Sequence, residues 1–219
     1  MCQDKLKFQV VSCFIFHNES IYGCVMRVIG GRAGGTKLVS FKGSAIRPTL
    51  DRVKESFINQ VRPVMGGARF LDLFAGTGNI GIEALSQGAA KVVFVESDRK
   101  AQELIARNLE KCRFGKAGDF QGPGLELLRT AALQAIRALD AKERCFDLVY
   151  VDPPFREGLY GETLLSLANS HLLNASSLVI VEHHRKNALL ENYGRLVLVK
   201  ERQIGDSCLS FFSLEVMAE

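Results

Sequence analysis

The chain has 219 residues, of which 47% are hydrophobic and 24% are charged. This is enough apolar material to bury a full core in one domain, perhaps with a short appendage, so the disordered and fibrous classes are excluded. The formal net charge of +4 is too small by itself to indicate binding to nucleic acid.

The cysteine pattern favours a reduced, cytoplasmic protein without a metal site. The six cysteines are scattered, with no C-x-x-C pair and no histidine at ligand spacing. Neither a zinc site nor a disulfide framework is therefore indicated. We expect no metal.

The N-terminal 25 residues differ in pattern from the rest of the chain. Their longest apolar run, 8–16, is far shorter than the roughly 20 residues that span a membrane. We expect residues 1–25 to be an atypical extension that is disordered, with an overlong start assignment as the alternative. No membrane association is expected.

Residues 26–65 are predicted to form a basic N-terminal element. Eight basic residues against two acidic ones between Met26 and Arg62 are typical of a phosphate-binding surface, with an ordinary solvated face as the alternative. Leu50, Val53, Phe57 and Val61 share one helical face, which predicts a helix capped by Thr49. The candidate RNA-binding residues are Arg27, Arg32, Lys37, Arg52 and Lys54, with Pro154 from a later motif.

Residues 66–219 show alternating strand and helix patterns. Strands are predicted at 69–73, 91–96, 125–128, 146–151, 178–181, 196–200 and 209–216, and helices at 80–87, 100–111, 132–142 and 162–172. A glycine-rich stretch at 115–124 reads as a surface insertion. This order predicts an α/β fold with a parallel, doubly wound sheet that binds ligands at the carboxyl ends of its strands.

A glycine-rich turn follows the first of these strands. Gly76, Gly78 and Gly81 satisfy G-x-G-x-x-G, and Glu96 ends the next strand 20 residues after Gly76. Glycines let the backbone approach a ligand closely, and a carboxylate at a strand end can accept hydrogen bonds from ribose hydroxyls. This motif alone fits NAD as well as S-adenosylmethionine.

Asp72 favours the methyl donor. An anion here would attract the cationic amino-acid end of S-adenosylmethionine and would repel a pyrophosphate. The alternative is that Asp72 caps backbone amides of its own loop.

The second motif, Asp152-Pro153-Pro154-Phe155, directly follows an apolar strand. Asp152 and the carbonyl of Pro153 can each accept one N–H of an exocyclic amine, which directs the nitrogen lone pair at a methyl group. Phe155 offers a flat face for stacking an unstacked base. The alternative is a simple turn with Phe155 in the core.

From Met26 onward the chain resembles the RsmD-type 16S rRNA (guanine-N2)-methyltransferases. The segments that carry the resemblance are 26–31 (MRVIGG), 47–49 (RPT) with 51–55 (DRVKE), 74–78 (FAGTG), and 152–155 (DPPF) with 158–160 (GLY). The first two are diagnostic, whereas the other two are shared with many amino methyltransferases.

The resemblance implies a Rossmann-like, seven-stranded methyltransferase domain at 66–219 with a small N-terminal substrate-binding element that also covers the cofactor. It implies methylation of an unstacked guanine in small-subunit ribosomal RNA by a monomer. The implied cofactor-binding residues are Arg47, Pro48, Thr49, Asp72, Phe74, Ala75, Gly76, Thr77, Gly78, Glu96 and Ser97. The implied catalytic residues are Asp152, Pro153 and Phe155.

One departure from the family pattern concerns the cofactor adenine. Family members place Asp or Asn after the third strand, where this chain has 128–132 (LRTAA). The adenine contact is therefore left open, with Asp119 as a weak alternative. His183 and His184 are interpreted as structural or RNA-facing rather than as a catalytic base.

Two rival functions stay open at this point. An N6-adenine DNA methyltransferase could use the same D-P-P-F geometry, although this chain has little room for a DNA-recognition region. A non-catalytic RNA-binding assembly factor could retain the fold.

Overall fold

The computed structural model describes residues 26–41, 48–115, 121–122, 124–154 and 159–215. The predictions for residues 1–25 lie outside these ranges. No described helix is both long and apolar enough to cross a membrane.

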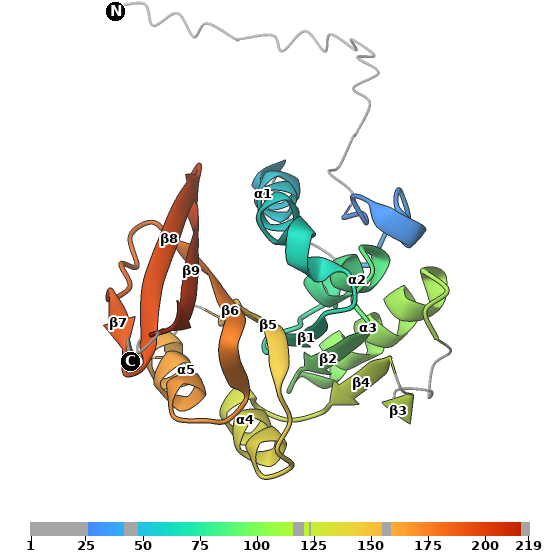
Figure 1. The fold of residues 1–219 in the computed structure, drawn as a ribbon. Helices are drawn as coiled ribbons and strands as arrows, with labels where there is room; N and C mark the ends of the chain where they lie inside the picture. Colours follow the sequence, from blue (N-terminus) through green and yellow to red (C-terminus); the bar gives the residue numbers. More distant parts are fainter. Residues whose placement is uncertain (1–25, 42–47, 116–120, 123, 155–158, 216–219) are drawn as a thin grey trace, which may run out of the picture.

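The described part of the chain contains one sheet of nine strands in the order β3-β4-β2-β1-β5-β6-β9-β8-β7 (Figure 1). Seven strands have four residues or more, as predicted, and two edge strands have only two. The strands are β1 (Arg69–Asp72), β2 (Lys91–Val95), β3 (Gln121–Gly122), β4 (Leu125–Leu128), β5 (Phe146–Val151), β6 (Leu173–His184), β7 (Asn192–Tyr193), β8 (Leu196–Ile204) and β9 (Ser207–Leu214).

The sheet is parallel only in its centre. Strands β4, β2, β1, β5 and β6 pair in parallel, whereas β9, β8 and β7 add in antiparallel pairs. The prediction of a parallel sheet is therefore wrong for the C-terminal strands. Only Gly205 and Asp206 separate β8 from β9, with Gly205 at φ 63°. Such a short connection can join only antiparallel neighbours.

Helices cover both faces of the sheet (Figure 1). On one face α1 (Pro48–Met65), α2 (Asn79–Ser86) and α3 (Arg99–Lys111) share a core that includes Phe57, Ile82 and Ile105. On the other face α4 (Ala132–Asp140) and α5 (Leu159–Ala168) share a core that includes Ile136 and Leu164. This double covering explains why the central strands are apolar on both sides.

Three predicted elements have bounds that are wrong by several residues. Helix α5 begins and ends earlier than the predicted 162–172, and β6 has 12 residues where only 178–181 were predicted. Strand β8 continues to Ile204, beyond the predicted end at residue 200. The N-terminal half of β6 contains Asn174 to Ser177, whose polar character hid the strand. A register shift between β5 and β6 accompanies this polar segment.

The chain order reverses between β1 and β5. From β1 the chain runs outward through β2 to β4 and then crosses back to β5 on the other side of β1. In doubly wound sheets such a reversal opens a crevice at the carboxyl ends of the two strands. The residues that follow β1 and β5 therefore meet at one place.

The segment at 26–41 precedes α1 and contacts the other elements. It forms a bridge between Arg27 and Lys37 and a short 3-10 helix (Gly31–Ala33) that lies against α2. Val28, Ala33 and Leu38 are buried in the same core as α1. The proposed division into 26–65 and 66–219 stays a prediction.

Candidate active site

A cavity of about 180 Å³ lies at the strand reversal. It is enclosed by the glycine-rich turn after β1, by the ends of β5 and β6, and by α1 with the segment before it. The lining residues are Met26, Lys54, Asp72, Phe74, Ala75, Gly76, Thr77, Asn79, Ile80, Tyr150, Asp152 and Glu182.

The two motifs predicted to form the site face this one cavity. Asp72 and Phe74 to Thr77 line it from the first motif, and Asp152 lines it from the second. The register of β1 beside β5 explains why they meet, because Asp72 pairs with Tyr150, which lies two residues before Asp152. The individual roles of these residues in binding and catalysis stay predictions.

Left-handed glycines shape the turn. Gly76 has φ 54° and Gly78 has φ 79°, and the Gly78 amide donates to the carbonyl of Ala75 at 2.7 Å. Residues with a side chain rarely adopt such backbone angles, so glycine is favoured at both positions. Gly81 has a different role: an added Cβ there would lie 2.3 Å from the ring of Phe94, so it allows α2 to pack closely on the sheet.

Asp72 is almost completely buried and has a raised pKa. Its Oδ2 accepts the amide of Gly81, in the first turn of α2, at 3.0 Å, so Asp72 does cap backbone amides nearby, as in the alternative that the sequence left open. Burial raises its pKa to about 7, and the charge of Glu96 adds to this. Asp72 also lines the cavity, so capping does not remove it from the site.

Glu96 supports the glycine-rich turn from the end of β2. Its Oε2 accepts the amide of Gly76 at 2.8 Å, and its Oε1 accepts the amide of Asp98 at 2.7 Å. A carboxylate oxygen has more than one lone pair, so these bonds leave capacity for ribose hydroxyls. Ser97 is exposed beside it.

Asp152, Tyr150 and Glu182 form the polar end of the cavity. The Tyr150 hydroxyl donates to Oε2 of Glu182 at 2.7 Å. Asp152 reaches solvent through the cavity, yet the protein packed around it raises its pKa well above the usual range, and the charges of Glu182 and Asp72 add to this. Burial likewise raises the pKa of Glu182, while the bond from Tyr150 opposes the shift.

The rest of the second motif is only partly described. Pro153 is buried and Pro154 is exposed. Phe155 lies outside the described residues, so its predicted stacking role stays a prediction.

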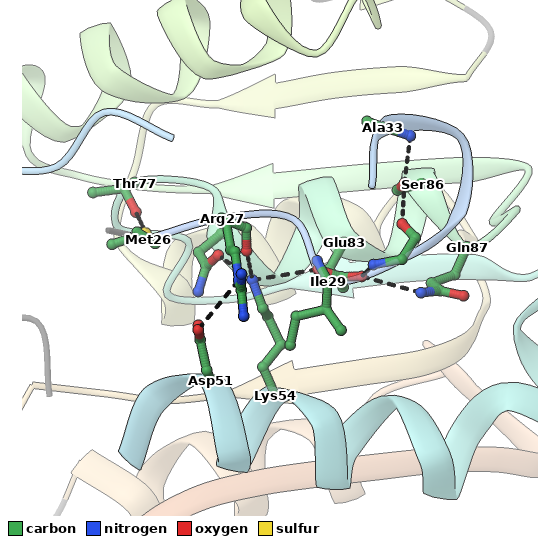
Figure 2. A network of polar contacts seen from close by, with 12 residues as sticks. Met26, Arg27, Ile29, Ala33, Asp51, Lys54, Thr77, Glu83, Ser86 and Gln87 are labelled. Atoms are coloured by element: carbon green, nitrogen blue, oxygen red, sulfur yellow. Dashed lines mark hydrogen bonds and ion pairs between the residues drawn. The ribbon is translucent and has the colours of Figure 1, made fainter. Parts of the chain in front are cut away.

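A buried polar network fixes the N-terminal segment beside the cavity (Figure 2). Glu83 on α2 accepts the amides of Ile29 at 2.7 Å and Gly30 at 3.0 Å. Lys54 on α1 lies 3.3 Å from Glu83 and donates to Asn79 at 2.8 Å and to the carbonyl of Arg27. The network joins α1, α2 and the segment before α1.

The structure corrects the prediction for Lys54. Its side chain is only 2% exposed and is ion-paired, so it is not available to an RNA phosphate on the surface. The signal was present in the sequence, because Lys54 lies on the same helical face as Phe57, Ile58 and Val61. Its Nζ instead stabilises the wall of the cavity.

The other predicted basic contacts are exposed. Arg27 is 3.6 Å from Asp51, and Arg32 lies over the ring of Phe114 at 4.6 Å. Lys37 and Arg52 are exposed as well. These four side chains are accessible to a polyanion, and RNA binding by them stays a prediction.

Three predicted cofactor contacts and the alternative adenine contact cannot be placed. Arg47 and Asp119 lie outside the described residues, and Pro48 and Thr49 begin α1 without described side chains. Within the described ranges, no group of three His, Cys, Asp or Glu side chains could hold a metal ion.

His183 is buried among structural contacts. Its Nε2 lies 2.8 Å from the hydroxyl of Ser210, and its Nδ1 lies 3.2 Å from the carbonyl of His184. His183 does not line the cavity. These contacts fit the structural interpretation.

Several lining residues were missed by the sequence predictions. Tyr150 and Glu182 come from strands β5 and β6, and Met26, Asn79 and Ile80 complete the wall. Glu182 had a usable signal, because it ends an apolar run at the carboxyl end of a predicted strand, as Asp152 does. Such residues meet at the same sheet edge.

The family model named "Conserved hypothetical protein 95" matches residues 26–213. The chain belongs to this family. It is 35% identical over 180 residues to "Putative rRNA methyltransferase YlbH" of Bacillus subtilis, which covers 82% of this chain and 94% of that protein. It is 34% identical to "Ribosomal RNA small subunit methyltransferase D" of Escherichia coli K12, covering 89% and 92% of the two chains.

Comparison with a solved structure also indicates a methyltransferase. The chain resembles "Putative methyltransferase yhhF from Escherichia coli" with a TM-score of 0.73 and 30% identity, covering 88% of this chain and 99% of that one. The predicted family, the Rossmann-like methyltransferase fold and the methyltransferase class are therefore confirmed.

The residues present fit S-adenosylmethionine, the predicted methyl donor. The cavity combines the buried carboxylate of Asp72, the open backbone at Gly76 and the apolar side chain of Ile80. A carboxylate suits the cationic amino-acid end of this donor, and the glycine backbone allows its close approach. The confirmed methyltransferase class agrees with this cofactor.

Proposed function

We propose that this protein transfers a methyl group from S-adenosylmethionine to the exocyclic N2 amine of a guanine in small-subunit (16S) ribosomal RNA. The single observation that carries the proposal is that Asp152 and the glycine-rich turn line the same cavity. The relatives named as ribosomal RNA small subunit methyltransferases support the choice of substrate.

The chemistry needs positioning more than a strong base. The lone pair of an aromatic amine is delocalised into the ring, so the amine is a weak nucleophile. Asp152 and the carbonyl of Pro153 would each accept one N–H, which holds the nitrogen in a geometry that directs its lone pair outward. The bound donor supplies an electrophilic methyl group on its sulfonium.

The balance of the reaction is simple. One N–C bond forms as one S–C bond breaks, the sulfur keeps the electron pair, and S-adenosylhomocysteine leaves. The amine loses a proton after the transfer, and water can accept it. Asp72 and the backbone of Gly76 would hold the donor on the other side of the cavity.

The exposed basic side chains would bind the RNA backbone. Arg27, Arg32, Lys37 and Arg52 belong to the segment and helix that border the cavity. Phosphate contacts of this kind position a substrate without reading its sequence. Phe155 would stack on the unstacked guanine.

The test is methyl transfer to defined substrates. Tritiated S-adenosylmethionine is offered to small ribosomal subunits and to naked 16S RNA, both from cells that lack this protein, and separately to duplex DNA. We expect label in N2-methylguanosine, which nucleoside mass spectrometry identifies and maps. N6-methyladenine in DNA would instead support the rival methyltransferase, and folded protein that does not bind the donor in calorimetry would support a non-catalytic factor.

A further inference from the structure

Glu182 is placed beside Asp152 by the pairing of two parallel strands. Val151 at the end of β5 pairs with Val181 on β6, so Asp152, the residue after β5, and Glu182 on β6 follow at the same level. Neighbouring strands are about 4.8 Å apart. Both side chains line the cavity.

Tyr150 holds the Glu182 carboxylate in a fixed orientation. Its hydroxyl donates to Oε2 of Glu182 at 2.7 Å, and its ring packs edge-on against Phe57 with centroids 5.0 Å apart. Tyr150 is only 1% exposed, so it has little freedom to move. The bond from Tyr150 goes to Oε2, so Oε1 of Glu182, a residue that lines the cavity, can act as an acceptor for a ligand there.

Two adjacent acceptors match the edge of guanine and not that of adenine. Guanine presents N1–H and the N2 amine side by side as donors on its Watson–Crick edge. Adenine presents its amine beside N1, which is an acceptor and would face a carboxylate oxygen. Enzymes that act on an unstacked base read this edge by hydrogen bonds.

We propose that Glu182 accepts the N1–H of the target guanine while Asp152 accepts an N2–H, so that the two carboxylates together select guanine over adenine. This inference rests on the proposed function and identifies the residue that reads the base. Burial raises the pKa of both carboxyl groups, and an N–H donor at each of them would stabilise its ionised form.

The test changes the hydrogen-bonding edge of the target base. The guanine mapped in the transfer assay is replaced by 2-aminopurine, which keeps the 2-amine but has an acceptor at N1. We expect the wild-type enzyme to prefer guanine by about 10- to 100-fold in kcat/KM, because a charged acceptor without its donor is costly. If the wild-type enzyme had equal kcat/KM values for the two bases, that result alone would overturn the inference.

The variant Glu182→Gln converts the acceptor into a group that can also donate to N1 of 2-aminopurine. We expect kcat/KM for guanine to fall by about 10- to 100-fold and the preference for guanine over 2-aminopurine to shrink by about 10-fold or more. Donor binding by calorimetry should be unchanged. Glu110→Gln, an exposed glutamate on α3 outside the cavity, is the matched control and should keep the wild-type preference.

The outcomes separate the two proposals. An equal loss of activity on both bases in Glu182→Gln, with the preference unchanged, would overturn the inference alone and leave Glu182 as a structural residue. If the wild-type enzyme methylated no guanine in 16S RNA or in the small subunit, the proposed function would fail and this inference with it.

Discussion

The ammonium group of Lys54 lies 3.3 Å from the carboxylate of Glu83, and neither side chain is more than 2% exposed. Burial lowers the pKa of Lys54, and the charge of Glu83 opposes that shift. Because Glu83 also accepts the amides of Ile29 and Gly30, this pair fixes the segment before α1 against α2.

Replacing Lys54 with Met should destabilise the protein strongly. The change leaves the Glu83 carboxylate buried without its counter-ion, and breaking a buried pair in this way costs roughly 3–5 kcal/mol in free energy of unfolding. Urea denaturation measures it. Arg52→Met, two residues away on the exposed face of α1, should change stability by less than about 0.5 kcal/mol. Equal stability of the two variants would contradict the buried pair.

Asp72 should make the stability of the ligand-free protein depend on pH. Its folded pKa of about 7 lies above the ordinary value of 3.8, so the folded state binds the proton more tightly. Its contribution is therefore fully present below about pH 4 and is lost as the pH rises through 7. The slope is at most about 1.4 kcal/mol per pH unit.

Thermal or urea unfolding of the wild-type protein and Asp72→Asn between pH 5 and pH 8 isolates this contribution. The difference in unfolding free energy, wild type minus variant, should decrease as the pH rises. A difference that stayed constant would show that Asp72 is already ionised in the folded protein at pH 5.

Replacing Asp152 with Asn should nearly abolish methyl transfer while sparing donor binding. An amide is a weaker acceptor than a carboxylate, and removing a key transition-state interaction costs about 100- to 1000-fold in kcat. Single-turnover transfer and calorimetry measure the two effects. Asp147→Asn, at the opposite end of β5 and ion-paired with Arg69, should keep full activity per folded molecule. A fully active Asp152→Asn enzyme would remove Asp152 from the mechanism.

Replacing Asn108 with Ala should loosen the glycine-rich turn. The buried amide of Asn108 donates to the carbonyls of Thr77 at 2.9 Å and Val39 at 3.0 Å and accepts the amide of Val39 at 2.7 Å. Each buried partner left unsatisfied costs about 1–3 kcal/mol. We expect lower stability and weaker donor binding by calorimetry. Asn59→Ala, on the exposed face of α1, is the control and should affect neither.

Replacing Gly81 with Ala should destabilise the contact between α2 and β2. The added methyl group would lie 2.3 Å from the Phe94 ring, and such overpacking costs about 1–3 kcal/mol in unfolding free energy. Gly161→Ala in α5 has only an ordinary contact at 3.8 Å, so it should be neutral or slightly stabilising. Urea denaturation compares them, and equal stability would contradict the tight packing.

The sequence by itself determined the elements and the two motifs of the site. Apolar runs and helical spacing are local properties, so β1, β2, β5 and the helices between them were predicted close to their bounds. The positions of Asp72 and Asp152 at strand ends then followed, because parallel strands in this topology place their carboxyl ends together.

Only the tertiary structure decided what the buried polar side chains contact. Helical spacing puts Lys54 on the apolar face of α1, but its counter-ion Glu83 lies 29 positions along the chain, and the place of Glu182 beside Asp152 depends on the register of β6 beside β5. The antiparallel direction of β8 and β9 likewise follows from the short turn between them. The sequence pattern did not show that this turn reverses the strand direction. These features depend on pairings between distant segments, and local periodicity contains no information about which segments will pair.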